Sequence, residues 1–168
     1  MSSFASVLAI PFPNIDPVAL QLGPVAVKWY GLAYMAGLLI GWLYIRKLIR
    51  SPALWPAATP PFSLEKTDDL LFFMTLGVVL GGRLGFVIFY EPLYYLNNPL
   101  EILQVWRGGM AFHGALVGCG IAIWAFARRA GVSPRSAMDM CAAAVPIGLF
   151  FGRVANFING ELFGRPTN

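Results

Sequence analysis

Four long apolar blocks constrain this chain more than any other feature of its sequence. Trp29–Ile45 and Met110–Ala127 run for 17 and 18 residues without a charged side chain. Leu70–Tyr90 and Met140–Gly160 are each 21 residues long, and each is interrupted by one arginine. Because about 20 apolar residues span the hydrocarbon core of a bilayer, the blocks predict four transmembrane helices. The predicted fold class is an all-α integral membrane protein, a bundle of about four transmembrane helices.

The composition supports a membrane protein. Only 12% of the 168 residues are charged, whereas about a quarter of the residues in a soluble domain are. Small residues recur four positions apart in the blocks, for example at Gly77, Gly81 and Gly85 and at Gly114 and Gly118. This spacing lets helix backbones approach closely in lipid. It predicts tight helix packing and carries no chemistry.

Basic residues are distributed unevenly among the connectors between the blocks. Three lie on one side of the predicted membrane: Lys28, Arg107 and Arg165. Seven lie on the other side: Arg46, Lys47, Arg50, Lys66, Arg128, Arg129 and Arg135. By the positive-inside rule, the N-terminus lies outside and the basic connectors lie in the cytoplasm. Charges of this kind are a topology signal and indicate no nucleic-acid partner.

Residues 1–28 differ from the rest of the chain. They contain four prolines, too many for one helix, and we predict an arm on the outer membrane surface. Residues 29–168 are predicted to form the helical bundle. The opening residues have no basic segment before their short apolar run, which is not typical of a signal peptide. We therefore expect the first span to direct insertion.

The most unusual polar residues lie in and after the fourth block, in "GRVANFINGELFGRPTN". An arginine inside a span costs about 2.5–3.5 kcal/mol on insertion scales, so Arg153 requires a reason. At 3.6 residues per turn, Asn156 lies about 60° and Gly160 about 20° from Arg153 around the helix. A guanidinium, an amide and bare backbone on one face predict an anion site, since arginine forks two hydrogen bonds to a phosphate. At this depth the anion would be a phospholipid headgroup.

A second arginine, Arg83, is the fourteenth residue of its 21-residue block, as Arg153 is of its own. "GGRLGFVIFYE" and "FGRVANFINGE" both have a Gly-Arg pair and a glutamate eight residues after the arginine. A parallel internal repeat would explain this echo. Two interpretations stay open for Arg83: pairing with a carboxylate or with helix-end carbonyls, and substrate binding.

His113 is the only histidine and lies at the predicted outer start of the third span, in "GGMAFHGALVG". It is either a buried hydrogen-bonding residue or a base, because an imidazole titrates near neutral pH. Tyr30 and Tyr34 are typical of an interfacial aromatic belt. Glu161 is a candidate partner of Arg153 or Arg165, or a group that orients a catalytic residue.

The sequence lacks the common motifs of metal, nucleotide and serine-hydrolase sites. The sequence contains no H-E-x-x-H, no Gly-rich phosphate loop and no G-x-S-x-G elbow. Cys119 and Cys141 occur in neither a C-x-x-C nor a His-rich context. We expect neither a metal nor a cofactor.

Four segments resemble the bacterial prolipoprotein diacylglyceryl transferases. "GRVANFINGELFGRPT" resembles their signature, and "IDPVALQLGPV", "VKWYGLAY" and "MAFHGALVG" fit the same family in the same order. Ala155 departs from the pattern, because the family usually has glycine there. The resemblance implies transfer of diacylglycerol from phosphatidylglycerol to the lipobox cysteine of a prolipoprotein. A thioether forms and glycerol phosphate leaves, as the first step of lipoprotein maturation at the bacterial inner membrane, with the active site towards the outer leaflet.

The resemblance also implies functional residues. The implied catalytic residues are Tyr30, His113, Arg153, Asn156 and Glu161. The implied substrate-binding residues are Arg153, Gly108, Gly114 and Gly164, and the position of Arg83 within its span adds that residue as a further candidate. The family is longer, with roughly seven spans and a second essential arginine beyond this chain. The resemblance therefore implies that the chain is an N-terminal portion.

The residues and the implied reaction agree on what the site must do. A thiol has a pKa near 8.5 and is only slightly ionised at neutral pH, so a base such as His113 would help. Arg153 and Asn156 would stabilise the charge on the departing phosphate. The alternative is a non-catalytic anion or phospholipid transporter with Arg83 and Arg153 as paired intramembrane arginines. A structural bundle that binds lipid without turnover is a third possibility.

Overall fold

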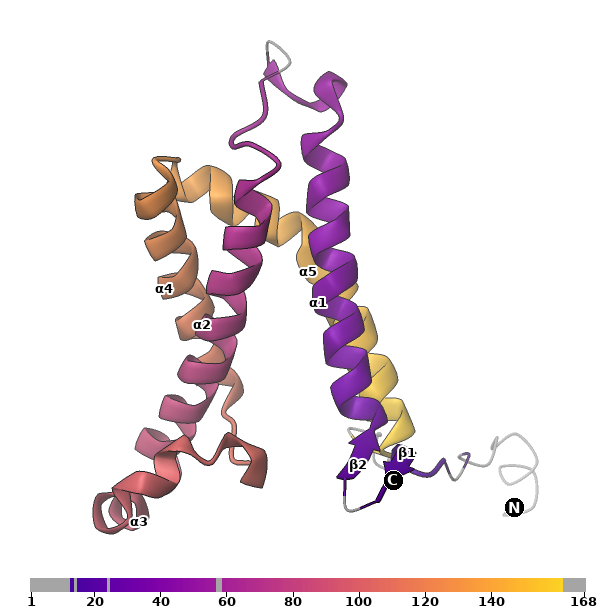
Figure 1. Ribbon diagram of the computed structural model, residues 1–168, viewed down its shortest axis with the longest axis vertical. Helices are drawn as coiled ribbons and strands as arrows, with labels where there is room; N and C mark the ends of the chain where they lie inside the picture. Colours follow the sequence, from indigo (N-terminus) through magenta and orange to yellow (C-terminus); the bar gives the residue numbers. More distant parts are fainter. Residues whose placement is uncertain (1–12, 14, 24, 57–58, 162–168) are drawn as a thin grey trace, which may run out of the picture. The chain divides into compact units, whose positions relative to one another are not determined.

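The computed structural model describes residues 13, 15–23, 25–56 and 59–161. The chain divides into two compact units, of which the first combines Met1–Gly41 with Val145–Asn168 and the second is Trp42–Ala144. Both α1 (Trp29–Ile49) and α5 (Pro134–Ile158) contribute to each unit (Figure 1).

Helices dominate both units (Figure 1). Besides α1 and α5, the long helices are α2 (Lys66–Phe89) and α4 (Phe112–Ala130). The short elements are α3 (Pro92–Asn97), the 3-10 helices η1 (Pro52–Leu54), η3 (Pro99–Leu103) and η4 (Val105–Arg107), and the strands β1 (Val18–Leu22) and β2 (Val25–Lys28).

Within the described ranges, α1, α2 and α5 are long and apolar enough to cross a membrane. Their exposed side chains include large apolar residues such as Leu39, Leu80 and Leu149, which suit contact with lipid. These helices confirm the predicted class of all-α integral membrane protein. The α4 helix has 19 residues and contains Arg128 and Arg129 in its last turn. It is not among the three helices of the described ranges that are long and apolar enough to cross a membrane.

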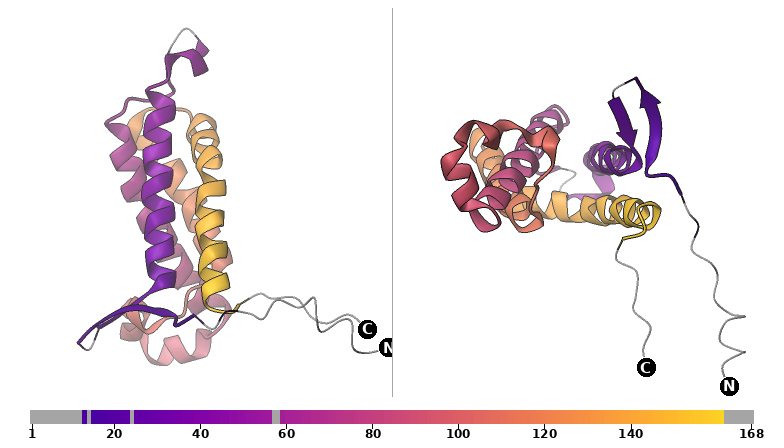
Figure 2. Two further views of the ribbon diagram at one scale, coloured as in Figure 1. Left: turned by 90° about the vertical axis from the view of Figure 1, so that its right-hand side faces the viewer. Right: turned by 90° about the horizontal axis from the view of Figure 1, so that it is seen from below.

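Facing glycines bring α2 and α4 into backbone contact inside the second unit (Figure 2). A Cβ added at Gly77 would lie 2.6 Å from the carbonyl oxygen of Gly118. One added at Gly85 would lie 2.6 Å from the Cα of Gly114. Side chains at these positions would push the helices apart, so the four-residue glycine spacing correctly predicted close packing.

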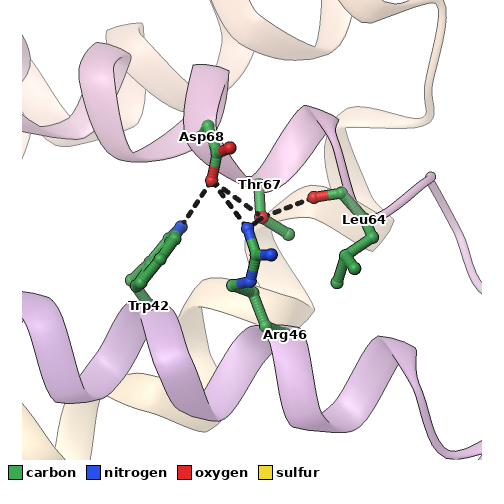
Figure 3. Close-up of polar contacts among 5 residues, drawn as sticks. All are labelled: Trp42, Arg46, Leu64, Thr67 and Asp68. Atoms are coloured by element: carbon green, nitrogen blue, oxygen red, sulfur yellow. Dashed lines mark hydrogen bonds and ion pairs between the residues drawn. The ribbon is translucent and has the colours of Figure 1, made fainter.

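A buried cluster and a polar contact hold the second unit together at the start of α2. The aromatic ring of Phe126 packs edge-on against those of Phe62 and Phe73, with centroids 5.5 and 6.3 Å apart. Asp68, in the first turn of α2, accepts hydrogen bonds from Trp42 Nε1 at 3.0 Å and from Arg46 Nη1 at 2.9 Å (Figure 3). A carboxylate there also interacts favourably with the helix dipole. The last part of α1 is thereby tied to α2.

The first unit contains an antiparallel hairpin and two packed helix halves. In the hairpin, Val18 pairs with Lys28 across the turn at Gly23, which has a φ of 59°. The α1 and α5 halves approach at Gly37, where an added Cβ would lie 3.2 Å from the Cα of Gly148.

This hairpin was not among the elements predicted from the sequence. Its signal was present, since "VALQL" and "VAVK" flank a Gly-Pro pair. Residues 1–12 of the predicted arm lie outside the described residues, and the location of the arm on the outer membrane surface stays a prediction.

Candidate functional site

The predicted site residues fall into both units. Tyr30, Arg153, Asn156 and Glu161 belong to the first unit, whereas Arg83, Gly108, His113 and Gly114 belong to the second. Gly164 lies outside the described residues.

The end of α5 is closed by a glycine turn. Gly160 has a φ of 66°, which residues with a side chain rarely adopt. The N–H of Glu161 donates to the carbonyl of Asn156 at 2.8 Å, and the N–H of Gly160 donates to that of Phe157 at 3.1 Å. These two bonds form the Schellman motif, which commonly ends helices at a glycine. The Asn-Gly-Glu order therefore fixes where Glu161 leaves the helix.

Asn159 orients the carboxylate of Glu161. Its Nδ2 donates to Oε1 of Glu161 at 3.2 Å. Its Oδ1 is buried and has no hydrogen-bond partner among the described residues. Asn159 was not among the site residues predicted from the sequence. The signal that could have found it is an amide two residues before a carboxylate, with a glycine between them.

Arg153 is exposed on α5, one turn before Asn156. Within the part of the chain that the structure describes, its guanidinium forms no hydrogen bond or ion pair, so none of these residues occupies its donors. Asn156 is half-buried beside it on the same helix, and the methyl group of Ala155 is fully buried at 0% exposure. The extra methyl at Ala155, compared with glycine, is thus accommodated by packing.

Tyr30 lies in the first turn of α1. Its phenol oxygen is 3.3 Å from that of Tyr34, one helix turn further on, and the two ring centroids are 5.0 Å apart. The carboxylate of Glu161 lies within electrostatic range of the Tyr30 hydroxyl. Tyr30 and Glu161 thus belong to the unit that also contains Arg153.

His113 is the second residue of α4 and is exposed. Its imidazole contacts the ring of Phe112 edge-on, with centroids 5.9 Å apart. Gly114 next to it has a packing role, because a Cβ there would lie 2.7 Å from the Cα of Gly85 and would also meet the carbonyl oxygen of Gly81. The glycine after the histidine is therefore required by the contact between α2 and α4.

Arg83 has surroundings opposite to those of Arg153. Its side chain is 4% exposed, and its guanidinium donates to backbone carbonyls of the connector, the segment of residues 90–111 between α2 and α4. The ring of Tyr95 covers one face of the cation, with the centroid 5.0 Å away. Gly108, which supplies one of these carbonyls, has a φ of 88°. Of the two open interpretations for Arg83, these contacts favour pairing with carbonyls.

The connector also borders an open pocket of about 310 Å³, near the lower limit of small-molecule sites in volume. The Tyr94 hydroxyl donates to Glu101 Oε2 at 2.7 Å, and this bond raises the pKa of Tyr94. Arg107 lies 3.6 Å from the same carboxylate oxygen. Tyr94, Glu101 and Arg107 of the wall are therefore engaged with one another. The pocket is lined by Arg83, Phe86, Glu91, Tyr94, Tyr95, Glu101, Arg107, Gly108 and Gly109.

No group of three or more His, Cys, Asp or Glu side chains that could hold a metal ion occurs in the described ranges. The polar groups of the candidate site residues described above are guanidinium groups, amides, carboxylates, phenols and an imidazole.

Comparison with known proteins identifies relatives over almost the whole chain. Residues 17–168 match the sequence profile of a family described as "Prolipoprotein diacylglyceryl transferase". A phosphatidylglycerol–prolipoprotein diacylglyceryl transferase of Rhizobium meliloti (strain 1021) is 55% identical over 166 residues, covering 98% of this chain and 59% of that protein. The protein of the same name from Phenylobacterium zucineum (strain HLK1) is 54% identical over 159 residues, covering 95% of this chain and 55% of that protein. The chain thus spans less than two thirds of the length of these relatives.

Proposed function

Because this chain belongs to the prolipoprotein diacylglyceryl transferase family, as its resemblance predicted, we propose that the complete protein transfers the diacylglyceryl group of phosphatidylglycerol to a prolipoprotein. The acceptor is the cysteine thiol of the lipobox. The names of the relatives contain both the lipid and the prolipoprotein. The reaction needs no cofactor, because the departing group is already part of the lipid.

The transfer is a displacement at one carbon of the lipid. The thiol loses its proton to a base, and the sulfur attacks the carbon of the diacylated glycerol that is bonded to the phosphodiester oxygen. The carbon–sulfur bond forms as the carbon–oxygen bond breaks, and glycerol phosphate leaves with the electron pair. Two tasks fall to the protein: stabilising negative charge on the phosphate and removing the thiol proton.

The exposed guanidinium of Arg153 is the observation that carries the proposal. It is exposed, lacks a partner in the described part of the chain, and stands one turn before Asn156 on α5. A bidentate guanidinium fits two phosphate oxygens, and the amide of Asn156 can add a donor. Donors that interact more strongly with the departing phosphate than with the intact lipid lower the barrier.

The other site residues receive roles that fit their surroundings. His113 removes the thiol proton, since it is exposed and imidazole is a general base near neutral pH. Glu161, oriented by Asn159, acts electrostatically on the hydroxyl of Tyr30 and helps to position the polar groups of this unit. Gly108 and Gly164 are proposed to shape the backbone around the substrate, whereas Gly114 supports the site by letting α4 pack against α2.

We place the protein in the bacterial inner membrane with its N-terminus on the outer side and the site towards the outer leaflet. The bilayer that surrounds it supplies the lipid substrate, and the signal peptide of the prolipoprotein is its protein partner. The support is the uneven distribution of basic residues among the connectors.

The transporter alternative relies on Arg83 and Arg153 acting as a pair. The contacts of Arg83 weaken it, because the guanidinium of Arg83 donates to backbone carbonyls of the connector, whereas a relay needs both cations free to pass an anion. No observation favours the structural bundle without turnover.

Mass spectrometry of a lipobox peptide tests the proposal. The complete protein, in vesicles containing phosphatidylglycerol, should add one diacylglyceryl mass to the peptide and release an equal amount of glycerol phosphate. A peptide with serine in place of the lipobox cysteine serves as the control. An unmodified cysteine peptide in the presence of folded protein would contradict the transferase activity.

A further inference from the structure

Arg83 holds four backbone carbonyl groups of the connector at once. Its Nε donates to the carbonyl of Ile102 at 2.8 Å and its Nη2 to that of Glu101 at 2.7 Å. Its Nη1 donates to the carbonyls of Gly108 and Gly109, at 2.7 and 3.1 Å. A guanidinium has five N–H groups, so four bonds leave little donor capacity for a ligand. The 4% exposure of the side chain limits access further.

The connector is shaped to present these carbonyls to the guanidinium. Glu101 and Ile102 lie near the end of η3, and the carbonyl of Glu101 accepts the N–H of Gln104 at 3.1 Å in addition to Nη2 of Arg83. Gly108 and Gly109 have φ values of 88° and 76°, a conformation that glycine adopts without steric cost. A Cβ at Gly109 would lie 2.7 Å from Nη1 of Arg83. A side chain at Gly109 would therefore collide with the guanidinium, whereas Gly108 is constrained by its φ alone.

The same turn leads directly into α4. The N–H of Ala111 donates to the carbonyl of Gly82 at 2.9 Å, and Ala111 is the N-cap residue of α4. Met110 packs against Gly82, since a Cβ there would lie 2.7 Å from the Met110 methyl carbon. Residues 82 and 83 of α2 thus fix the start of α4, and His113 comes two positions after Ala111.

We propose that Arg83 is a positioning residue: by holding the Gly108–Gly109 turn it sets the start of α4 and the place of the His113 imidazole, and it does not bind the lipid headgroup. The effect on turnover rests on the proposed function, because it acts through His113 as the base. The structural part of the proposal stands independently of that function.

Hydrogen–deuterium exchange tests the structural part. It is measured on the complete protein in nanodiscs containing phosphatidylglycerol, for the parent, Arg83→Lys and Gly108→Ala. Lysine keeps the charge but cannot reach four carbonyls, and alanine strains the turn at Gly108, where space is open and Arg83 is untouched. The control is Arg107→Gln, which removes an arginine of the same connector whose side chain is 63% exposed.

Exchange of the amides in residues 101–111 should become about tenfold faster in both Arg83→Lys and Gly108→Ala, the equivalent of one lost hydrogen bond. Exchange in Arg107→Gln should match the parent. Parent-like exchange in Arg83→Lys would overturn the proposal. If Arg83→Lys fails to fold, Gly108→Ala decides, because it leaves α2 intact: parent-like exchange of residues 101–111 in that variant also overturns the proposal.

Steady-state kinetics separate positioning from headgroup binding. Arg83→Lys should lower kcat for diacylglyceryl transfer about tenfold while the KM for phosphatidylglycerol stays within about twofold, because removing a direct contact to the lipid would instead raise KM. A raised KM with unchanged kcat would overturn the positioning role. If the parent forms no thioether, the proposed function fails, and the exchange measurement still decides whether Arg83 holds the connector.

Discussion

Arg83 in α2 and Arg153 in α5 hold the same position in their apolar blocks, yet their surroundings are opposite. Arg83 is buried under Tyr95 and donates to four backbone carbonyls. Arg153 is exposed and lacks a partner in the described ranges. After Arg83 the helix runs on for six residues to Phe89, and after Arg153 for five residues to Ile158. The difference therefore lies in the segment that comes after each helix.

A returning connector comes after α2, whereas a short turn comes after α5. The connector brings carbonyls back to Arg83 through a pair of positive-φ glycines. The turn at Gly160 instead places Asn159 and Glu161 at the end of the helix and supplies no carbonyl to Arg153. An arginine inside a span is a candidate functional residue, and donors that none of the described residues occupies distinguish Arg153 from Arg83.

The largest expected effect concerns His113, which lies in the region of Arg83. If His113 is the base, His113→Gln should slow transfer by about 10²–10⁴-fold, the usual range for loss of a general base. The loss should shrink as the pH rises towards the thiol's own pKa, because hydroxide then supplies the thiolate. Rates for the parent and the variant, measured from about pH 6 to 9, check this.

Parallel pH profiles for the parent and His113→Gln would exclude the general-base role. His113 would then position the lipid or the connector, and the region around Arg83 would be structural throughout. Phe112→Leu, which changes the neighbouring exposed ring without removing a base, is the matched control and should keep the pH profile of the parent.

A smaller effect is expected from the glycine contact that supports the Arg83 region. Gly81→Ala places a methyl group 2.7 Å from the Cα of Gly118, and overpacking of this kind costs about 1–3 kcal/mol of the free energy of unfolding. Thermal unfolding in detergent measures it. Gly120→Ala, on α4 with nothing within 4 Å of the new Cβ, is the control. Equal stability of the two variants would contradict the close approach of α2 and α4.

In the Arg153 region, Asn159→Ala removes the hydrogen bond to Glu161 and should reduce the transfer rate by up to about tenfold, since one hydrogen bond is worth about 0.5–1.5 kcal/mol. Asn98→Ala removes an amide that donates to the carbonyl of Tyr94 at 3.0 Å and serves as the control. A rate of Asn159→Ala equal to that of the parent would show that Glu161 does not depend on Asn159.

The smallest perturbation tests the membrane side of both regions. In a background with Cys119 and Cys141 replaced by alanine, Asn97→Cys should react with an impermeant maleimide in intact spheroplasts, whereas Ser133→Cys should not. Activity should stay at the level of the background protein. Labelling in the reverse sense would contradict the topology predicted from the basic residues and the assignment of the site to the outer leaflet.

Much of the fold was predictable because a lipid environment requires long apolar helices and favours small residues where helices pack. Apolar blocks locate the parts of helices that suit a bilayer, and glycines four residues apart locate close contacts. The helices extend beyond the blocks into polar residues: α2 begins at Lys66 and α5 at Pro134. Hydropathy does not detect these extensions, because helix starts favour polar residues and proline.

The two arginine environments were less predictable. The shared face of Arg153 and Asn156 was predicted from spacing along one helix. The partners of Arg83 lie 18–26 residues away along the chain and are backbone carbonyls, which carry no residue-type signal. Only the Gly108–Gly109 pair pointed to an unusual backbone. The segments around Arg83 and Arg153 are thus similar in sequence, but the surroundings of the two arginines differ.

The most direct test of the central claim is the kinetics of Arg153→Lys in the complete protein. Lysine keeps the charge but loses bidentate contact with the phosphate, so kcat/KM for phosphatidylglycerol should fall by about 10²–10³-fold, as when one donor to a developing anion is removed. Arg107→Lys, an exposed arginine exchanged in the same way, should retain the parent value. A kcat/KM for Arg153→Lys within about twofold of the parent would contradict the role of Arg153 in holding the lipid phosphate.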